Sequence, residues 1–500
     1  MIALATAVLL LVCSAANALD VPGTGGRVTA SGYLDGLAVV GTEDSPDQDP
    51  QALLVLRADA PLAQRLRAHL ELRGREGGPF EGGHPGFYSL VHTFQNRSPS
   101  AEATEAWVEA SFRKADVRVG IQRFAWGKLD GIPPTDVLNP ADYHDPIVVD
   151  WEERKIGVPA IWGRYYLPDV SRLRLSGLNA SLTWVPFAIP SRLPLLQERW
   201  FPGATIAGDA LRIDAKTTSA LLNVPAPAQR IPLEFETQNH RPSIDWHSGG
   251  IGLRLGGTIG TTDVAFYHYS GAYTGPDIDI RSFAKLCKED CQPHMLIRSR
   301  NLFRQANDVM HMVGGDLATT IGGATVRAEV ASLWDRPYLR LAKELVSPNA
   351  LTGLKNDNVL KMQFAHHRWV YVPLGDLFVD RDSAEWGIGA DYLWRGWMPL
   401  LQVNQVVFYD DGPALVVRSP ETRLTGSLRK SFFGERVLAE VRGIYTIEPH
   451  SWFVYPRVDY LVRDDLRLRL GYLAIGGPLD SLIGQYKQND EVVFQARYSF

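Results

Sequence analysis

Apolar residues alternate with charged residues in several short runs of this chain. Between residues 66 and 73, Leu and Ala alternate with Arg, His and Glu, and between 466 and 470 three leucines alternate with two arginines. Alternation with a period of two is the pattern of a β-strand whose two faces meet different surroundings. After the first 18 residues, no apolar stretch reaches the roughly 18 residues that a membrane-spanning helix needs. The pattern therefore predicts an all-β fold.

The polar faces of these strands carry mainly arginine and glutamate, whereas strands that face bulk water favour Lys, Thr and Ser. We interpret these faces as the wall of a water-filled lumen. Aromatic residues make up 10% of the chain and it contains 45 glycines, a composition typical of transmembrane barrels. We therefore expect a single antiparallel transmembrane β-barrel of the bacterial outer membrane over residues 19–500. It should have about 18–20 strands, within a range of roughly 16–20.

Both ends of the chain indicate export. The first 18 residues carry no charge and end in an A-x-A pattern, which predicts a signal peptide, with a retained anchor as the alternative. At the other end Phe494, Ala496, Tyr498 and Phe500 share one face of a strand. This run resembles the C-terminal signal of outer-membrane proteins that the barrel-assembly machinery reads. We expect Phe500 to serve in assembly, and the barrel to contact outer-membrane lipid and lipopolysaccharide.

Short turns alternate with long connections, as they do in bacterial barrels, whose long loops lie outside the cell. The long connections are expected at 127–160, 186–244, 274–307 and 335–358. An even strand number requires a descending strand after Trp334, and 338–346 is the candidate. The third long connection contains Cys287 and Cys291, for which a local disulfide is expected, with metal binding or redox chemistry as alternatives.

The connection that begins near Trp184 is rich in aromatic residues and proline as far as Pro202. We expect an interfacial aromatic belt that continues into an ordered extracellular loop. A docking surface for a hydrophobic ligand is the alternative.

The segment 127–142 contains three prolines together with Gly, Asn and Asp, which favour tight turns over regular strand or helix. With Gln122 and Trp126 before it, the segment resembles an element of the large proteobacterial outer-membrane channels of the alginate-export type and of related porin-like proteins. In those proteins a strand is followed by Trp-Gly, a turn and Asp…Asn-Pro-x-Asp. The resemblance implies an export or uptake conduit of about eighteen strands.

Three interpretations of this loop stay open. Its Asp and Asn side chains can cap turns and pin the loop to the barrel wall. Alternatively, the loop folds inward and places Asp130, Asp136, Asp142 and Asp145 at a constriction, where rings of charge select ions. The third interpretation is a calcium site made by these carboxylates.

Arginine dominates the expected lumen face. Because arginine keeps its proton, fixed guanidinium groups can guide an anionic solute, although cross-strand ion pairs that fill the barrel are an equal alternative. The predicted pore-lining residues are Arg67, Arg118, Gln122, Asp130, Asp136, Asp142, Arg174, Arg254, Arg327, Arg442, Arg467 and Arg469.

The chain has none of the common catalytic or phosphate-binding motifs, so neither an enzyme nor a cofactor or resident metal is expected. The net charge of -5 does not suggest a nucleic-acid partner. We expect a channel or conduit for a small or polymeric solute, with an anion favoured by the arginines. The alternatives are a barrel subunit that passes hydrophobic cargo from a periplasmic or inner-membrane transport partner, and a surface receptor or adhesin. A membrane hydrolase is the least favoured.

Overall fold

The structure is a computed structural model. It describes residues 19–20, 28–42, 50–77, 89–91, 100–189, 191–192, 199–200, 210–213, 215–222, 224–239, 246, 248–274, 279–287, 292–301, 309–341, 361–364, 367–372 and 378–500. The expected signal peptide and Cys291 lie outside the described residues, so the cleavage and disulfide predictions stay predictions.

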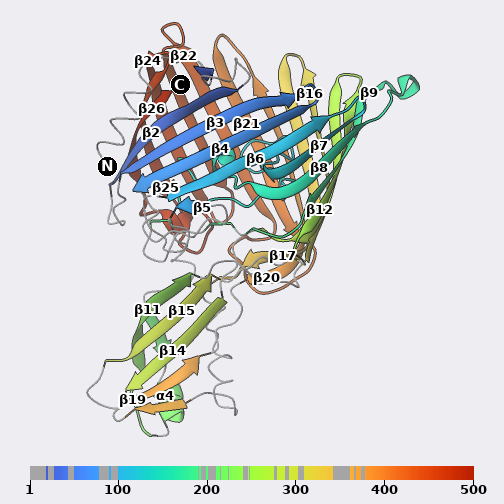
Figure 1. The fold of residues 1–500 in the computed structure, drawn as a ribbon. Coiled ribbons are helices and arrows are strands. Elements are labelled where there is room, and N and C mark those ends of the chain that lie inside the picture. The colour runs from blue at the N-terminus through green and yellow to red at the C-terminus, as the bar shows by residue number, and fades with distance from the viewer. Residues whose placement is uncertain are drawn as a thin grey trace.

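Eighteen antiparallel strands form a closed barrel, which occupies the upper part of Figure 1. Each strand pairs with the next in chain order, and pairing of the first with the last, β2 with β26, closes the wall. The strands are β2 (Thr29–Gly41), β3 (Gln51–Ala63), β4 (Leu66–Gly77), β6 (Ser100–Ser111), β7 (Ala115–Gln122), β8 (Val158–Tyr166), β9 (Leu175–Val185), β12 (Gly250–Ile259), β13 (Thr262–Ala272), β16 (Val309–Ile321), β17 (Ala324–Leu339), β20 (Phe378–Tyr392), β21 (Trp397–Phe408), β22 (Glu421–Phe432), β23 (Val437–Thr446), β24 (Ser451–Arg463), β25 (Leu466–Gly476) and β26 (Glu491–Ser499). The prediction of an all-β barrel is confirmed, and the strand number lies within the predicted range.

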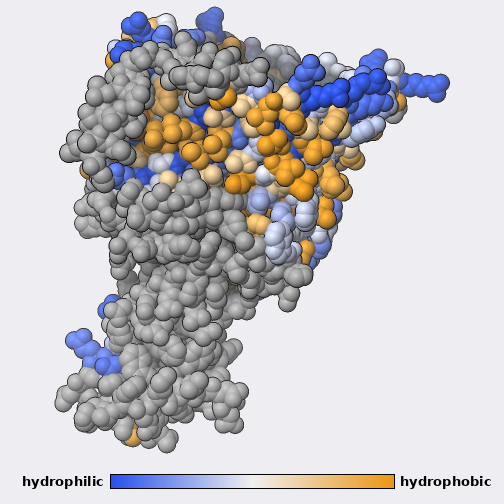
Figure 2. Space-filling model, viewed as in Figure 1, coloured by the Kyte–Doolittle hydropathy of each residue, from blue (hydrophilic) through white to orange (hydrophobic). Residues whose placement is uncertain are grey.

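The alternation separates an apolar exterior from a polar interior. On β4, Leu70 is exposed at 38% while its neighbour Glu71 is buried at 1%. On β25, Leu468 and Leu470 are likewise exposed, and Arg469 between them faces inward to an ion pair. Figure 2 shows apolar side chains gathered in a band across the visible wall, with hydrophilic residues above it. A wall with these two faces suits lipid outside and water inside.

The alternation of β9 shifts by one residue near Ser176 and Gly177, which predicts a β-bulge. The structure confirms it, because the pairing of β9 with β12 changes register between Asn179 and Ser176, opposite Gly257. Gly177 has a φ of +61°, a left-handed conformation that glycine adopts without steric cost. The bulge lets the apolar side chains on both sides of it face outward.

The last residue of the chain closes the barrel seam. Gly32 of β2 donates a backbone hydrogen bond of 2.8 Å to the oxygen of Phe500, and Phe500 donates one of 2.9 Å back to Gly32. Phe500 thus lies at the end of the wall where the turns are short. Its role as an assembly signal stays a prediction.

A second, six-stranded sheet is built from three long connections, all on the same side of the barrel, and it lies below the barrel in Figure 1. Each connection contributes two strands, and β11 pairs with β15 in parallel, so that segments from two connections interlock. The strands are β10 (Ala210–Ile213) and β11 (Gln229–Asn239), β14 (Asp279–Cys287) and β15 (His294–Asn301), and β18 (Lys361–Phe364) and β19 (His367–Val372). The sequence predicts these connections as loops and gives no indication of this sheet.

The expected descending barrel strand at 338–346 is wrong. Tyr338 and Leu339 still belong to β17, and β17 pairs directly with β20. The connection therefore begins after Leu339 rather than at residue 335. The physical reason is a bulge at Asp335, where φ is +55° and the register shifts between Leu333 and Arg336. The bulge interrupts the alternation and imitates the end of a strand.

The remaining elements are short. They are β1 (Leu19–Asp20), β5 (Ser89–Val91), α2 (Trp151–Arg154), α4 (Ala215–Leu222), η2 (Ser171–Leu173) and η3 (Gly484–Tyr486). No helix among the described residues is long and apolar enough to cross a membrane.

Candidate functional site

The connection between β7 and β8, residues 123–157, folds into the lumen. It leaves the wall after Gln122 and returns at Val158. Between these points it contacts inward-facing side chains of strands all around the barrel, including Glu329 of β17, Gln402 of β21 and Arg497 of β26. We call residues 123–157 the inner loop. It turns a wide barrel into one with a narrowed lumen.

A single carboxylate holds the first part of the inner loop. Glu329 is buried at 3% and accepts hydrogen bonds from the backbone N–H of Lys128 (2.9 Å), Leu129 (3.3 Å) and Thr135 (2.7 Å), and from the Thr135 hydroxyl (2.7 Å). Four donors converge on one side chain, and backbone donors to a carboxylate make strong hydrogen bonds. Glu329 therefore fastens this part of the loop to β17.

The two ends of the inner loop are joined by Asn139. Its Oδ1 accepts a hydrogen bond of 2.7 Å from the N–H of Phe124, and its Nδ2 donates one of 2.8 Å to the oxygen of Ile156. Gln122, the last residue of β7, is fully buried and donates to the oxygen of Ala160 at 2.8 Å. These contacts satisfy backbone groups that would otherwise lose water on entering the lumen.

On one side of the lumen the inner loop packs on the wall in an apolar core. Trp126 of the loop packs on Tyr267 of β13, with ring centroids 5.0 Å apart. Glycines in the wall make room for the loop: a Cβ at Gly252 would lie 2.8 Å from the Trp126 ring, and one at Gly314 would lie 2.7 Å from the Thr135 methyl. The core consists of Phe124, Trp126, Leu138, Ile156, Val158, Ala160, Trp162, Val185, Phe187, Ile189, Ala265, Tyr267, Tyr269, Met310, Met312, Ala331 and Leu333. The inward faces of β13, β16 and β17 therefore carry apolar as well as polar residues, because part of each face packs on the loop.

A buried ion pair stabilises the loop from within. The Lys155 ammonium lies 2.6 Å from Asp136 Oδ2, and both side chains are 2% exposed. Lys155 also donates to the oxygen of Phe124 at 3.3 Å. Burial raises the pKa of the Asp136 carboxyl, and Lys155 offsets this in part. Such a pair is strongly destabilising when only one partner is removed, because the other charge stays buried.

We therefore expect Lys155→Met to loosen the inner loop. Removal of one partner of a buried pair costs about 3–5 kcal/mol. If a protease cleaves the loop only when it opens locally, this cost makes cleavage faster by about 100-fold or more. The measurement is limited proteolysis of the folded protein in detergent. The double variant with Asp136→Asn should recover most of the protection, and cleavage of the single variant at the wild-type rate would contradict this account.

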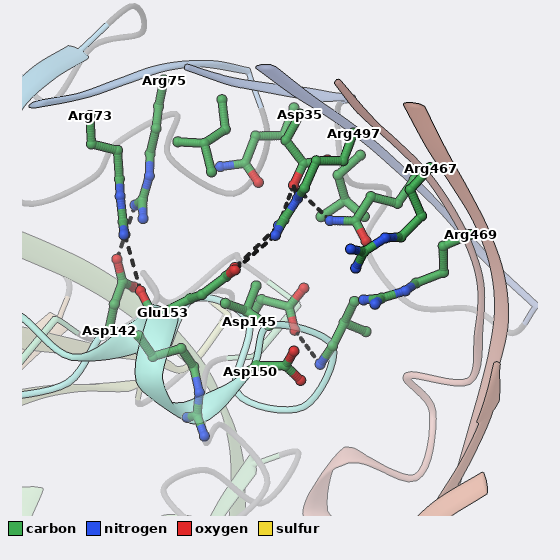
Figure 3. Close-up of a pocket in the computed structure, with 17 residues that line it drawn as sticks. Asp35, Arg73, Arg75, Asp142, Asp145, Asp150, Glu153, Arg467, Arg469 and Arg497 are labelled. Carbon is green, nitrogen blue, oxygen red and sulfur yellow. Dashed lines mark hydrogen bonds and ion pairs between the residues drawn. The ribbon is translucent and has the colours of Figure 1, made fainter. Parts of the chain in front are cut away.

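On the other side of the lumen the inner loop faces a charged cavity of about 90 Å³. Figure 3 shows the wall arginines entering from above and the acids of the loop below them. The lining residues are Asp35, Leu37, Gln51, Leu53, Arg73, Arg75, Asp142, Asp145, Val148, Val149, Asp150, Glu153, Arg154, Arg467, Arg469, Gln495 and Arg497. The cavity is thus bounded by β2, β3, β4, β25 and β26 on one side and by the loop on the other.

Ion pairs join the loop to the wall around this cavity. Arg75 lies 3.1 Å from Asp142, Arg497 lies 2.9 Å from Glu153, and Arg442 lies 2.5 Å from Asp150. These pairs bridge β4, β26 and β23 to one short stretch of loop. They hold the loop in the lumen.

The pKa values of two loop acids reflect these contacts. Burial raises the pKa of the Asp142 carboxyl, but His144, Arg75 and Arg192 outweigh it and hold that pKa well below its usual range. Burial likewise raises the pKa of Asp150, and Arg442 and Arg457 together lower it below the ordinary value. Both side chains are therefore negative at neutral pH.

Of the predicted pore-lining residues, Asp142, Arg467 and Arg469 line the cavity. Most of the others form ion pairs or hydrogen bonds elsewhere in the lumen. Arg67 and Arg118 both pair with Glu109, Arg254 donates to Asn179, Arg327 pairs with Asp391 and lies 3.7 Å from Asp130, Asp136 pairs with Lys155, Arg442 pairs with Asp150, and Gln122 donates to Ala160.

Two interpretations from the sequence are wrong. Arg174 does not line the pore, because it lies exposed in the turn between β8 and β9 with a φ of +51°. The calcium site fails because the carboxylates are not brought together: Asp136 faces Lys155, Asp142 faces Arg75, and Asp130 lies near Arg327. Among the described residues no group of three or more His, Cys, Asp or Glu side chains could hold a metal ion.

The aromatic segment near Trp184 is only partly a belt. Trp184 is exposed at 45% on the outer wall, as a belt residue should be. Phe187 and Ile189, however, turn inward and join the apolar core, and Trp200 is buried at 1% on the opposite side, against Tyr486. Burial in the lumen rather than contact with lipid explains these aromatic side chains.

Several residues that line the cavity are not among those predicted from the sequence. Arg497 is recognisable in retrospect, because Phe494, Ala496 and Tyr498 face outward and the residues between them must face the lumen. Arg73 follows from the same rule on β4. Asp150 and Glu153 had no comparable signal, since their positions depend on how the loop folds back.

A closed antiparallel wall with an apolar exterior, a charged interior and a long loop folded into the lumen defines a porin-like β-barrel. The chain belongs to the family described as "Protein of unknown function (DUF1302)", which matches residues 83–409.

Among solved structures the chain is similar to OpdL from Pseudomonas aeruginosa, with 8% identity, a TM-score of 0.45, and coverage of 95% of this chain and 98% of that one. It is also similar to OccAB1 from Acinetobacter baumannii, with 9% identity, a TM-score of 0.45, and coverage of 97% and 99%. For OmpF from Salmonella typhi in complex with daunomycin, the identity is 8%, the TM-score 0.38, and the coverage 95% and 97%. A search of curated proteins found no match.

Proposed function

We propose that the protein is a channel of the bacterial outer membrane, and that the cavity between the inner loop and the wall arginines is its constriction. The observation that carries the proposal is the position of the inner loop, which crosses the lumen of a closed barrel and leaves a charged cavity on one side. In a closed barrel every backbone group within the lipid is hydrogen-bonded to a neighbouring strand. The lumen can therefore hold water and conduct solutes. Fixed charges at a narrow place select the solute.

The arginines favour an anion over a cation. Five arginines and one aspartate of the wall line the cavity, while the loop contributes four acids and one arginine. Towards the short turns, Arg67 keeps 59% of its side chain exposed and Arg57 keeps 40%, so both present charge to water. We propose a moderate preference for small anions, because the acids of the loop balance much of the positive wall.

Liposome swelling tests the channel itself. Protein refolded into liposomes should admit arabinose quickly and a trisaccharide such as raffinose slowly or not at all, because the inner loop narrows the lumen. Heat-denatured protein in the same lipid is the control. Swelling in arabinose no faster than in protein-free liposomes would refute the channel.

A surface receptor is the second candidate function, and the six-stranded sheet favours it. Three separate connections combine into one sheet on the long-loop side of the barrel, and such order is more than a passive connection needs. If the protein is a receptor, a barrel that lacks residues 210–239 should still conduct ions but should no longer bind to intact cells or to host surface components. The interactions with the barrel-assembly machinery, with lipopolysaccharide and with a periplasmic or inner-membrane transport partner stay predictions.

A further inference from the structure

Apart from Asp35 of the wall and Arg154 of the loop, the charges around the cavity are sorted by sign. The wall side carries Arg73 and Arg75 on β4, Arg467 and Arg469 on β25, and Arg497 on β26. The loop side carries Asp142, Asp145, Asp150 and Glu153. In Figure 3 the two sets face one another across the cavity. A solute inside it therefore meets positive charge on one side and negative charge on the other.

Most of these charges are already satisfied by protein partners. Asp142, Glu153 and Asp150 each pair with a wall arginine, at 3.1, 2.9 and 2.5 Å. On the wall, Arg469 donates to both oxygens of Asp459, at 2.7 and 2.9 Å. Groups that are paired in this way orient the loop and leave little capacity for a solute.

Two acids of the cavity, Asp35 and Asp145, each keep one buried oxygen without a hydrogen-bond partner among the described residues. Asp35 pairs through its other oxygen with Arg497, whereas the described residues stabilise Asp145 only through backbone N–H groups of Val148, Ile147 and Val149 and through the more distant charge of Arg154. The Oδ1 of Asp145 accepts a hydrogen bond of 2.9 Å from the N–H of Val148, but its Oδ2 is buried and accepts none from any described residue. The residue is only 7% exposed and lines the cavity. Burial raises the pKa of this carboxyl. A buried carboxylate oxygen without a donor is costly unless something binds to it.

Arg467 is its counterpart on the wall. Its side chain is 48% exposed, and its contact with a carboxylate among the described residues is long, 4.0 Å from Nη1 to Asp459 Oδ2. Asp459 is already engaged by Arg469. The guanidinium therefore has donors available for a carboxylate, which it can bind in bidentate fashion.

We infer that the cavity is a binding site for small zwitterionic solutes, with an ammonium group held by Asp145 and a carboxylate held by Arg467. The inference rests on the proposed channel function and specifies its substrate class. A simple anion satisfies Arg467 but leaves Asp145 without a donor and is repelled by it. A simple cation satisfies Asp145 but is repelled by Arg467 and leaves its donors without an acceptor. A solute that carries both charges satisfies both groups at once.

Current block in a planar bilayer tests the inference. The wild-type protein is recorded in 0.1 M KCl, while γ-aminobutyrate, butyrate or butylammonium is added as probe. Each probe has a four-carbon chain, and the probes differ in charge. We expect γ-aminobutyrate to halve the current at a concentration about ten-fold lower than either of the others. A current blocked equally well by butyrate would overturn the zwitterion site and leave the channel intact, whereas the absence of any current would overturn the channel.

A variant tests whether Asp145 binds the ammonium group. Asp145→Asn should raise the half-blocking concentration of γ-aminobutyrate about ten-fold and leave that of butyrate unchanged or lower. Asp316→Asn is the matched control, because Asp316 is also a buried, inward-facing aspartate with an oxygen that lacks a partner, yet it does not line the cavity. Equal effects of the two substitutions would overturn the assignment. If the Asn variant does not fold, the comparison of the three probes on the wild type still decides the inference.

Discussion

Glu329→Ala is expected to widen the channel, with a single-channel conductance at least double that of the wild type. The substitution removes the acceptor of three backbone N–H groups and of the Thr135 hydroxyl. Each buried donor left without an acceptor costs about 1–3 kcal/mol, so the first part of the inner loop should leave β17 and seek water. The lumen that the loop now fills would then be open to ions, and raffinose should enter liposomes at a rate near that of arabinose.

Two variants separate this effect from a general loss of structure. Glu329→Gln keeps one of the two acceptor oxygens, each of which accepts from two donors, so it should raise the conductance less than Glu329→Ala does. Glu109→Ala removes another wall carboxylate that is buried at 3%, but Glu109 pairs with Arg67 and Arg118 of the wall and not with the loop. A conductance of Glu329→Ala equal to the wild-type value, with the protein folded, would show that this carboxylate does not hold the loop.

Arg467→Glu is expected to reverse the ion selectivity. Arg467 is the wall arginine of the cavity with the weakest ion pair, so its charge acts on the solution more than that of its paired neighbours. The change replaces one positive charge by one negative charge beside four acids of the loop. The permeability ratio of chloride to potassium should fall from above one to below one. Zero-current potentials in a ten-to-one KCl gradient give this ratio.

Arg467→Lys keeps the charge and is the control for changes of shape. It should preserve the sign of the zero-current potential and weaken only the recognition of carboxylates, because an ammonium cannot bind them in bidentate fashion. Wild-type protein that already prefers potassium would contradict the proposed role of the wall arginines.

The barrel could be predicted from the sequence because the pattern that produces it, alternation along each strand, is visible within a few consecutive residues. Alternation on β4 and β25 places Leu70 and Leu470 outward and Glu71 and Arg469 inward, and no distant contact is needed to decide this. The same rule located the bulge at Gly177 in β9. It failed at Asp335, because the bulge in β17 resembles the end of that strand.

The second sheet and the interior of the lumen depend on contacts between distant segments. The parallel pairing of β11 with β15 joins two connections that are separated by two barrel strands, and nothing in either segment alone indicates it. The apolar inward residues Met310, Met312 and Leu333 likewise make sense only once Trp126 and its neighbours are known to lie in the lumen. Local pattern gives the direction of a side chain, whereas the loop decides what that side chain meets.

The candidate site was predictable in part for the same reason. Arg467 and Arg469 follow from alternation, and the prolines and aspartates after Trp126 leave inward folding as one of three interpretations of the loop. The pairs that give the cavity its character, such as Arg75 with Asp142 and Arg497 with Glu153, join residues 67 and 344 positions apart. Such pairs depend on the path of the loop across the lumen.

Chemical modification of the cavity tests most directly whether ions pass between the inner loop and the wall arginines. Gln495 of β26 lines the cavity, and Val119 of β7 is exposed at 49% on the outer wall. With cysteine at position 495, a water-soluble thiosulfonate reagent that adds a sulfonate should reduce the single-channel current by at least half. The same reagent should leave the wild type and the Val119→Cys variant unchanged. Complete modification at position 495 with no change in current would contradict the account.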